Sequence, residues 1–359
     1  MLSYDETFLD IKIAFLMITL IMTLLGNSMV LMAIYYDSRL RTAINFFVAC
    51  LATSDIAVAL LSVTIRLFTL FSEKLRLRKS LVTMTLCRFW IWIDIFCEAA
   101  SIFTLTVISI ERYFKICRPY VYCERMTKRL AIYVIVFVWI IAALLASLAM
   151  LPFGDKGIII DRNQCYNYNK IFYTIAPVVA FFLPLLILIV MYAMIFRIAI
   201  LHFKKSNRVL MRDPTSSHYS VYKDLKATKT LFIVVSTFIV CWGPFLYFSN
   251  IPIWIPIHDP LGKTLKYLKT VIVIILPYAN SFFNPIIYAC FDKSYQRAFR
   301  KILQKTFCHK YHGLGPKNVN KTEMKESDEN ERKFNLPLYE FKSVQRKRYN
   351  RRNLHRADL

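Results

Sequence analysis

The chain has 359 residues, of which 57% are hydrophobic and 19% charged, and its mean hydropathy is +0.43. Soluble domains contain about 25% charged residues, so this composition argues against a cytosolic enzyme and favours long segments within a bilayer. The formal net charge of +24 is compatible with nucleic acid or anionic lipid as a partner, and its meaning depends on where the basic residues lie.

Seven apolar runs are long enough to cross a membrane, since a span needs about 20 residues at a rise of about 1.5 Å each. They predict helices, because lipid offers no partner for unpaired backbone groups. The fold expected for residues 11–290 is therefore an all-α membrane protein, a seven-transmembrane helix bundle. Its spans are expected near residues 11–35, 44–70, 85–116, 129–151, 171–201, 226–253 and 265–290.

The basic residues give a first indication of orientation. Most of the 47 Lys and Arg residues fall in the segment after residue 290 and in the loops near 36–43, 112–129 and 197–229. The positive-inside rule places this side in the cytoplasm. Without the segment after 290 the margin is narrow, and the basic loop at 73–79 argues the other way.

The cysteines give a second indication. Cys87 and Cys165 fall on one side of the membrane, and a disulfide between them would need the oxidising, outer face. We therefore expect a multi-pass protein of the plasma membrane, with residues 1–10 as an extracellular N-terminus. This acidic segment has no signal-peptide pattern, so the first helix would serve as the targeting signal.

The chain changes character after residue 290. Residues 291–308 predict a short amphipathic eighth helix on the membrane surface, with one apolar face made by Phe291, Tyr295, Phe299, Ile302 and Leu303. Cys308 is a candidate lipidation site or a free thiol. Residues 309–359 predict a disordered basic cytoplasmic tail. Because this tail follows seven predicted membrane spans, its basic block at 346–352 favours membrane lipids or a regulator as partner, and we expect no nucleic acid.

Polar residues inside apolar spans are costly and are therefore candidates for function. Prolines within the spans each free a backbone carbonyl and bend their helix. Several of these residues combine into short motifs, which are Gly26-Asn27, Leu51-Ala52-Thr53-Ser54-Asp55, Glu111-Arg112-Tyr113, Cys241-Trp242-Gly243-Pro244 and Asn284-Pro285-Ile286-Ile287-Tyr288.

With Trp139, Pro184 and Tyr192 between them, these motifs make the chain resemble the rhodopsin-like (class A) G-protein-coupled receptors over about residues 1–308. Within that family it is most similar to the biogenic and trace amine receptor group. The resemblance implies a receptor that binds a small extracellular ligand and activates heterotrimeric G proteins. It also implies arrestin and receptor kinases as partners. No nucleophile–base pair is evident in the sequence, so we predict that the chain is not an enzyme.

The resemblance assigns an activation switch to the cytoplasmic side. Arg112 would pair with Glu111 and with Asp224 in the inactive state, and would turn toward Tyr192 and Tyr288 in the active state. Asp224 has an alternative interpretation as a solvated charge at the end of a loop. The family's packed triad below the ligand corresponds to Ile102, Pro184 and Phe238. Cys87 and Arg112 lie about 37 Å apart by helix rise, at opposite edges of one span.

A further set of residues matches the family's sodium and water site. A buried carboxylate such as that of Asp55 needs a counter-ion or a proton. Oxygen ligands for a sodium ion are available on Ser101, Asn280 and Asn284, with Asn27 and Ser281 nearby. We expect this allosteric ion and no other cofactor.

Asp94 matches the position that binds the protonated amine in monoamine receptors. It lies about 10 Å below Cys87 by helix rise. Tyr278 matches a tyrosine that hydrogen-bonds to this carboxylate, and Trp90, Trp242 and Phe245 would surround the ligand. A carboxylate with aromatic faces suits an ammonium group. Serines that hold catechol hydroxyls in catecholamine receptors are replaced by Ala176, Pro177 and Ala180.

Two charged neighbours of Asp94 leave alternatives open. Glu98 lies one turn deeper, and like charges at this spacing repel, so one carboxyl group would be protonated or neutralised. Arg66 in the second span could be the neutralising group. If Arg66 pairs with Asp94, the chain is instead a class A receptor for a peptide or lipid. A channel or transporter is a remote alternative, because the spans show no internal repeat.

Overall fold

The computed structural model describes residues 2–75, 82–151, 157–161, 164–167, 169–209, 217–249, 267–268 and 271–308. The chain divides into two units, residues 1–303 and 304–359. Almost all described residues belong to the first unit. The tail predicted at 309–359 lies outside the described residues.

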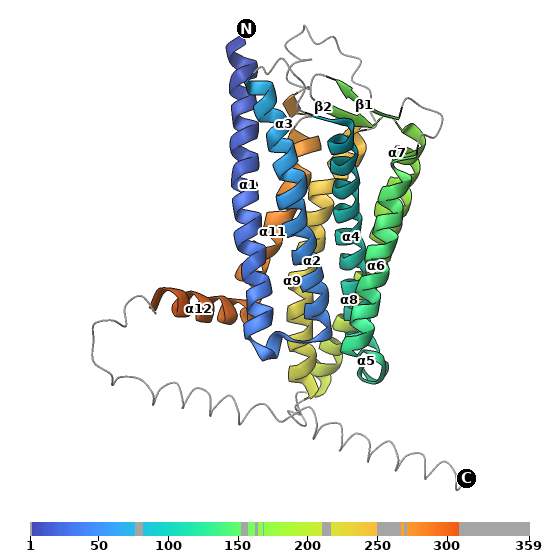
Figure 1. Ribbon diagram of the computed structural model, residues 1–359. Coiled ribbons are helices and arrows are strands. Elements are labelled where there is room, and N and C mark those ends of the chain that lie inside the picture. Colours follow the sequence, from blue (N-terminus) through green and yellow to red (C-terminus); the bar gives the residue numbers. More distant parts are fainter. Residues whose placement is uncertain are drawn as a thin grey trace. The chain divides into compact units, whose positions relative to one another are not determined.

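Seven long helical segments lie side by side in the described part of the chain (Figure 1). Four are single α-helices, which are α1 (Leu2–Tyr36), α4 (Met84–Cys117), α6 (Lys128–Leu148) and α9 (Ser217–Ser249). The other three each contain a π-helical stretch. The first consists of α2 (Ala43–Ala57), η2 (Val58–Val63) and α3 (Thr64–Lys74), and the second of α7 (Lys170–Pro177), η3 (Val178–Phe182) and α8 (Leu183–Val209). The third consists of η4 (Val271–Ile275) and α11 (Leu276–Phe291). Two short helices, η1 (Ser38–Leu40) and α5 (Pro119–Arg125), connect segments.

The length and hydropathy of these segments fit a membrane protein. Among the described residues, five helices are long and apolar enough to cross a bilayer, and the apolar stretch Lys229–Phe245 of α9 is shorter. Together with the family match reported below, this confirms the predicted all-α membrane bundle. The helices extend beyond the apolar runs that predicted them. For example, α1 begins at Leu2 rather than near residue 11, and Glu6 near its start suits the positive end of the helix dipole.

Side-chain caps explain where several helices begin. The Thr83 hydroxyl oxygen accepts a hydrogen bond from the Leu86 backbone N–H at 3.2 Å and so starts α4. Thr127 caps α6 and Asn169 caps α7 in the same way. Each cap satisfies a backbone donor that the first helical turn leaves unpaired.

Prolines accompany two of the three π-helical stretches. Pro177 and Pro184 flank η3, and Pro277 follows η4. Because proline has no N–H, the carbonyl four residues before it loses its helical partner, and a wider π turn accommodates the change. The stretch η2 contains no proline, and nothing in its composition predicts its wider turn.

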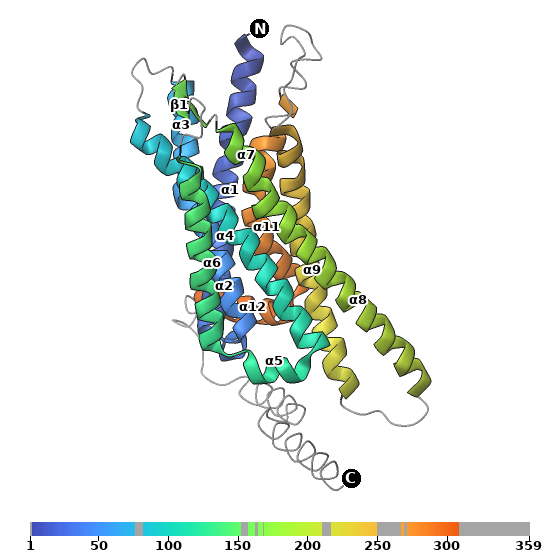
Figure 2. The same cartoon turned by 90° about the vertical axis from the view of Figure 1, so that its right-hand side faces the viewer.

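The third helical segment, α4, occupies the centre of the bundle. It contacts α2, α6, α8 and α9, between which it runs in Figure 2, and most of its residues from 97 to 112 are buried. By contrast, α6 and α8 present large apolar side chains outward, including Phe137, Leu144, Leu186 and Phe196. Exposed apolar surface of this extent suits helices that face lipid. Residues carried by α4 are therefore the ones placed to act inside the bundle.

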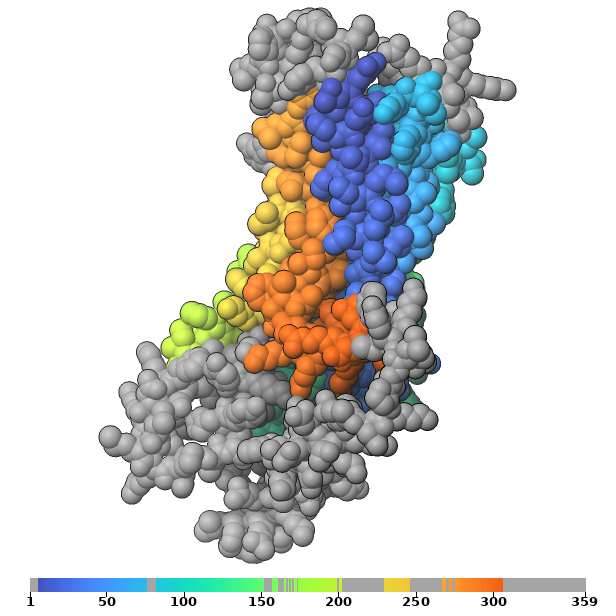
Figure 3. Space-filling model, turned by 90° about the vertical axis from the view of Figure 1, so that its left-hand side faces the viewer, coloured from blue at the N-terminus to red at the C-terminus, as the bar shows by residue number. Residues whose placement is uncertain are grey.

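A close approach between α1 and α11 depends on one glycine, Gly26. A Cβ atom added to Gly26 would lie 2.6 Å from Cγ of Pro285. The adjacent Asn27 uses its side-chain Nδ2 to donate to the Ser281 carbonyl at 3.1 Å. Ser281 precedes Pro285 by four residues, so Asn27 supplies the hydrogen bond that the proline cannot. The two helices lie side by side in Figure 3, in blue and orange.

The amphipathic helix predicted at 291–308 is α12 (Lys293–Cys308). Tyr295 and Phe299 are buried, whereas Phe291 and Leu303 are exposed, so the face toward the bundle is narrower than the apolar stripe. Tyr295 stacks on Tyr288 with ring centroids 5.3 Å apart. The Tyr295 hydroxyl also donates to Asn45 Oδ1 at 3.1 Å, which ties α12 to α2. The side chain of Cys308 lies outside the described residues.

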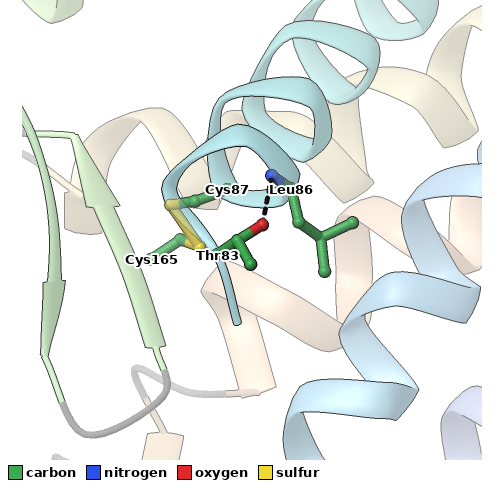
Figure 4. Close-up of a disulfide and its surroundings, with 4 residues drawn as sticks. All are labelled: Thr83, Leu86, Cys87 and Cys165. Atoms are coloured by element: carbon green, nitrogen blue, oxygen red, sulfur yellow. Dashed lines mark hydrogen bonds between the residues drawn. A yellow bond between two sulfur atoms is a disulfide. The ribbon is translucent and has the colours of Figure 1, made fainter. Parts of the chain in front are cut away.

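The loop between α6 and α7 forms a hairpin that was not predicted. Strand β1 (Ile158–Asp161) pairs antiparallel with β2 (Gln164–Asn167). Cys165 in β2 forms a disulfide with Cys87 near the start of α4, with Cα atoms 5.6 Å apart (Figure 4). This confirms the predicted disulfide, which holds the hairpin against the end of the central helix.

Candidate functional site

A cavity of about 510 Å³ opens between the helices at the end of the bundle that carries the hairpin. Cys165 and Asn167 of β2 line it, together with residues of α3, α4, α7, η3, α9 and α11. All the predicted ligand-binding residues line this one cavity, namely Trp90, Asp94, Glu98, Trp242, Phe245 and Tyr278. The structure therefore brings together side chains that are far apart in the sequence.

Two hydroxyl groups from neighbouring helices position Asp94. Its Oδ1 accepts a hydrogen bond from Ser62 Oγ of η2 and another from the Tyr278 hydroxyl of α11 at 3.4 Å. Ser62 Oγ also lies 3.1 Å from the Tyr278 hydroxyl and accepts from Trp90 Nε1 at 3.1 Å. Ser62, at the centre of this network, was not among the predicted site residues. The network fixes the carboxylate while leaving it part of the cavity wall.

Arg66 lies on the same side of the cavity. Its guanidinium carbon is 5.6 Å from the centroid of the Trp90 ring, which is a favourable cation–π distance. Arg66 and Asp94 both line the cavity. An ion pair between them would therefore occupy the same carboxylate that the amine interpretation assigns to the ligand.

Glu98 lines the cavity one helical turn deeper than Asp94. Its side chain is partly buried, and among the described residues it makes no hydrogen bond or ion pair. Arg66 is the only basic residue among the described residues that line the cavity. The cavity lining therefore carries two carboxyl groups one helical turn apart and one guanidinium group.

Aromatic rings form the deep end of the cavity. The Trp242 ring centroid lies 5.3 Å from that of Phe245 and 6.1 Å from that of Phe238. Phe181 of η3 stacks on Phe238 at 6.0 Å and was missed in the sequence, where it is one of many phenylalanines in an apolar run. Such faces are attractive to cations and exclude water from the carboxylates above them.

The face contributed by the fifth segment is apolar. Ala176, Pro177 and Ala180 line the cavity, and none of them carries a hydroxyl group. The sequence analysis expected no hydrogen bond from these three side chains to a catechol, and their place in the cavity wall agrees with that expectation.

Asp55 is fully buried between α2 and α11. Its Oδ2 accepts from Asn284 Nδ2 at 2.9 Å. Among the described residues, three buried side-chain oxygens here lack a hydrogen-bond donor, which are Asp55 Oδ1, Asn280 Oδ1 and Asn284 Oδ1. Ser101 Oγ, 3.0 Å from Ser54 Oγ, is buried in the same region. Unpaired acceptor oxygens around a carboxylate suit a hard cation with its water, so the residues present fit a sodium ion.

The predicted switch residues lie at the other end of α4. Arg112 Nε is 3.4 Å from Glu111 Oε2, and both side chains are buried. Glu111 Oε1 accepts a hydrogen bond of 2.6 Å from the hydroxyl of Tyr122 in α5. Burial and the nearby Glu111 carboxylate raise the pKa of Tyr122 well above its ordinary value, so it remains a donor at neutral pH. Tyr122 was missed because its loop gave no helical pattern.

The other predicted switch residues take different positions. Tyr192 accepts a hydrogen bond of 3.5 Å from Ser109 Oγ, and Ser109 lies on α4, three residues before Arg112. Tyr288 instead stacks on the ring of Tyr295 in α12. Ile102, Pro184 and Phe238 are all buried, and Ile102 and Phe238 also line the cavity. Asp224 belongs to α9, but its side chain lies outside the described residues, and its pairing with Arg112 stays a prediction.

Comparisons with known proteins agree with this geometry. Residues 26–288 match the family model described as 7 transmembrane receptor (rhodopsin family). The octopamine receptor beta-2R of Chilo suppressalis is 29% identical over 324 residues, covering 82% of this chain and 79% of the relative. The D(1A) dopamine receptor of Xenopus laevis is 29% identical over 341 residues, covering 83% and 73%. The alpha-1A adrenergic receptor of Oryzias latipes is 28% identical over 309 residues, covering 78% and 63%.

Proposed function

This chain belongs to the rhodopsin family of seven-transmembrane receptors, and from that premise we propose that it binds a protonated small amine and acts through heterotrimeric G proteins. It is a multi-pass membrane protein. The relatives named above are receptors for octopamine, for dopamine and of the adrenergic type, and they support an amine ligand here.

One observation carries the ligand class. The Asp94 carboxylate lines a cavity of about 510 Å³ whose walls are mostly apolar and aromatic. A carboxylate removed from water must be compensated by donors or by a cation. Ser62 and Tyr278 hold its Oδ1 and set its orientation. A primary or secondary ammonium group would complete the site with a charge-assisted hydrogen bond.

The apolar face at Ala176, Pro177 and Ala180 narrows the ligand further. A catechol bound there would lose its water contacts without gaining a side-chain hydrogen bond, which costs binding free energy. The proposed ligand is therefore an amine whose remaining surface is apolar or aromatic on that side.

We assign signal transfer to Arg112. Its pairing with Glu111 at 3.4 Å is the kind of contact that two helix arrangements can make or break. On activation Arg112 would turn toward Tyr192, which is already bonded to the neighbouring Ser109. The proposed G-protein contact forms on this side.

The remaining partners are assigned on chemistry. A sodium ion held by Asp55, Ser101, Asn280 and Asn284 would supply positive charge to a buried carboxylate and favour the inactive arrangement. The exposed basic side chains of α12, including Lys293, Arg297 and Lys301, suit anionic lipid of the inner leaflet. The proposed location is the plasma membrane with the N-terminus outside, and arrestin and receptor kinases are proposed as cytoplasmic partners.

The experiment is a screen of small amines on cells that express the full chain, with cAMP and calcium as readouts. We expect a saturable response to at least one protonated amine and none in cells without the chain. A response confined to peptides or uncharged lipids would contradict the amine assignment and favour pairing of Asp94 with Arg66.

A further inference from the structure

Two carboxylates, and not one, line the cavity. Asp94 and Glu98 are four residues apart on α4, so their backbones are separated by about 6 Å along the helix. Asp94 accepts hydrogen bonds from Ser62 and Tyr278. Glu98 makes no hydrogen bond or ion pair among the described residues, although it is partly buried and lines a cavity that also has aromatic walls.

The two acids differ in what surrounds them. The outer carboxylate has two hydroxyl donors, and Arg66 lines the same side of the cavity near Trp90. The inner one shares the cavity wall with Trp242, Phe238 and Ile102, and Arg66 is the only basic residue among the described lining residues. Protein groups thus compensate Asp94 and leave Glu98 to the occupant of the cavity.

An unpaired acid in an apolar cavity is a strong selective element. Its desolvation disfavours any ligand that covers it with a methyl or methylene group. A ligand that places a second ammonium there gains a charge pair in a setting that water screens poorly. Aromatic faces within the same cavity add cation–π attraction for that group.

We propose that the ligands preferred by this receptor are diamines, with one ammonium group on Asp94 and the second on Glu98. This inference rests on the amine function proposed above and names the ligand class of the same site. The spacing of the carboxylates suits a chain of about three to five carbons between the nitrogens, because about 6 Å separates the two turns. Arg66 lies at the outer carboxylate and leaves the inner ammonium position unopposed.

The test compares matched pairs of probes on the full chain in cells, using a G-protein activation readout. Each pair is an α,ω-diaminoalkane of three, four or five carbons and the monoamine of the same carbon number. The wild-type receptor should respond to the best diamine at a concentration at least about tenfold lower than to its monoamine, since close charge pairs couple strongly. Surface expression is measured for every variant.

Variants at the two acids separate the two claims. Glu98→Gln should abolish the preference for the diamine, because the amide keeps the size of the side chain and removes the charge that holds the second ammonium group. Glu98→Asp keeps the charge one methylene farther back, so it should retain the preference and shift it to a longer diamine. Asp94→Asn should weaken both members of each pair.

Three results would overturn the inference. One is equal potency of diamine and monoamine on the wild type, and another is an unchanged preference in Glu98→Gln. Both leave the amine function standing, because the monoamines still act through Asp94. The third is silence toward every amine at normal surface expression, which contradicts the amine function itself and the diamine inference with it.

Discussion

The contact between Gly26 and Pro285 shows how one missing side chain sets a helix distance. The neighbouring Asn27 bonds to the carbonyl that Pro285 leaves free, so both interactions need α1 and α11 to be in close contact. A substituent at residue 26 would separate the helices and break the bond from Asn27 as well.

Gly26→Ala is therefore expected to lower stability, because its Cβ would lie 2.6 Å from Pro285 Cγ. Overpacking of this kind costs about 1–3 kcal/mol, which should lower the melting temperature of the purified receptor in detergent. Gly243→Ala is the matched control, since its Cβ meets nothing described within 4 Å. Equal melting temperatures for the two variants would contradict the close contact.

Single residues also show what the sequence could predict about the site. Asp94, Tyr278 and Trp242 stand in motifs with a fixed place on their helices, and the cavity contains all three. Ser62 could not be assigned in this way. It lies in the π-helical stretch η2, where the side-chain direction no longer follows a period of 3.6 residues. The hydrogen bonds that join Ser62 to Asp94, Trp90 and Tyr278 could therefore be identified only from the structure.

The junction of α4 and α5 links the Glu111–Arg112 pair to the surface at the end of the bundle opposite the hairpin. The hydroxyl of Tyr122 reaches the buried Glu111, which in turn is adjacent to Arg112. A short helix in a loop is thus coupled to the charge pair of the central helix.

Tyr122→Phe removes this one hydrogen bond and keeps the ring. A hydrogen bond to a charged group contributes about 1.5–3 kcal/mol, so α5 should open more often and basal signalling should rise. Hydrogen–deuterium exchange of residues 119–125 should become faster in the variant. Unchanged exchange and unchanged basal activity would show that the bond does not hold α5 in place.

Arg112 itself is expected to be necessary for signalling and not for ligand binding. It lies 18 residues from Asp94 on α4, or about 27 Å by helix rise. Arg112→Ala should abolish stimulated nucleotide exchange on a G protein while ligand affinity stays within about threefold. Normal exchange from a variant that reaches the cell surface would refute the assignment.

Element boundaries show the limits of hydropathy. Apolar runs predicted the positions of the helical segments, because the lipid environment dictates their composition. They did not predict the hairpin of β1 and β2, whose strands are short and whose place depends on the disulfide to Cys87. The Thr83 cap, rather than hydropathy, decides where α4 begins.

Across the whole molecule, Ser101 of the Asp55 region lies on α4 between Asp94 of the cavity and Arg112. The Asp55 region also joins α2 to α11 through the bond from Asn284 to Asp55. A cation held there would bias every helix that contributes a ligand, and by linkage would change ligand affinity at the cavity.

Raised sodium is accordingly expected to weaken agonist binding by about fivefold or more, compared with equal concentrations of a bulky organic cation as control. Asp55→Asn should remove that difference, because it takes away the charge that holds the ion. A sodium effect that survives Asp55→Asn would place the ion elsewhere.

The claim that connects these scales is that the Asp94 carboxylate recognises a protonated amine. The most direct measurement is the affinity of an active amine for purified wild-type receptor and for Asp94→Asn, at equal folded fraction. Loss of a charge-assisted hydrogen bond in a dry cavity should lower affinity by roughly ten- to a hundredfold, with Arg112→Ala as a binding-competent control. Equal affinity of the Asp94→Asn receptor for the amine would contradict the account.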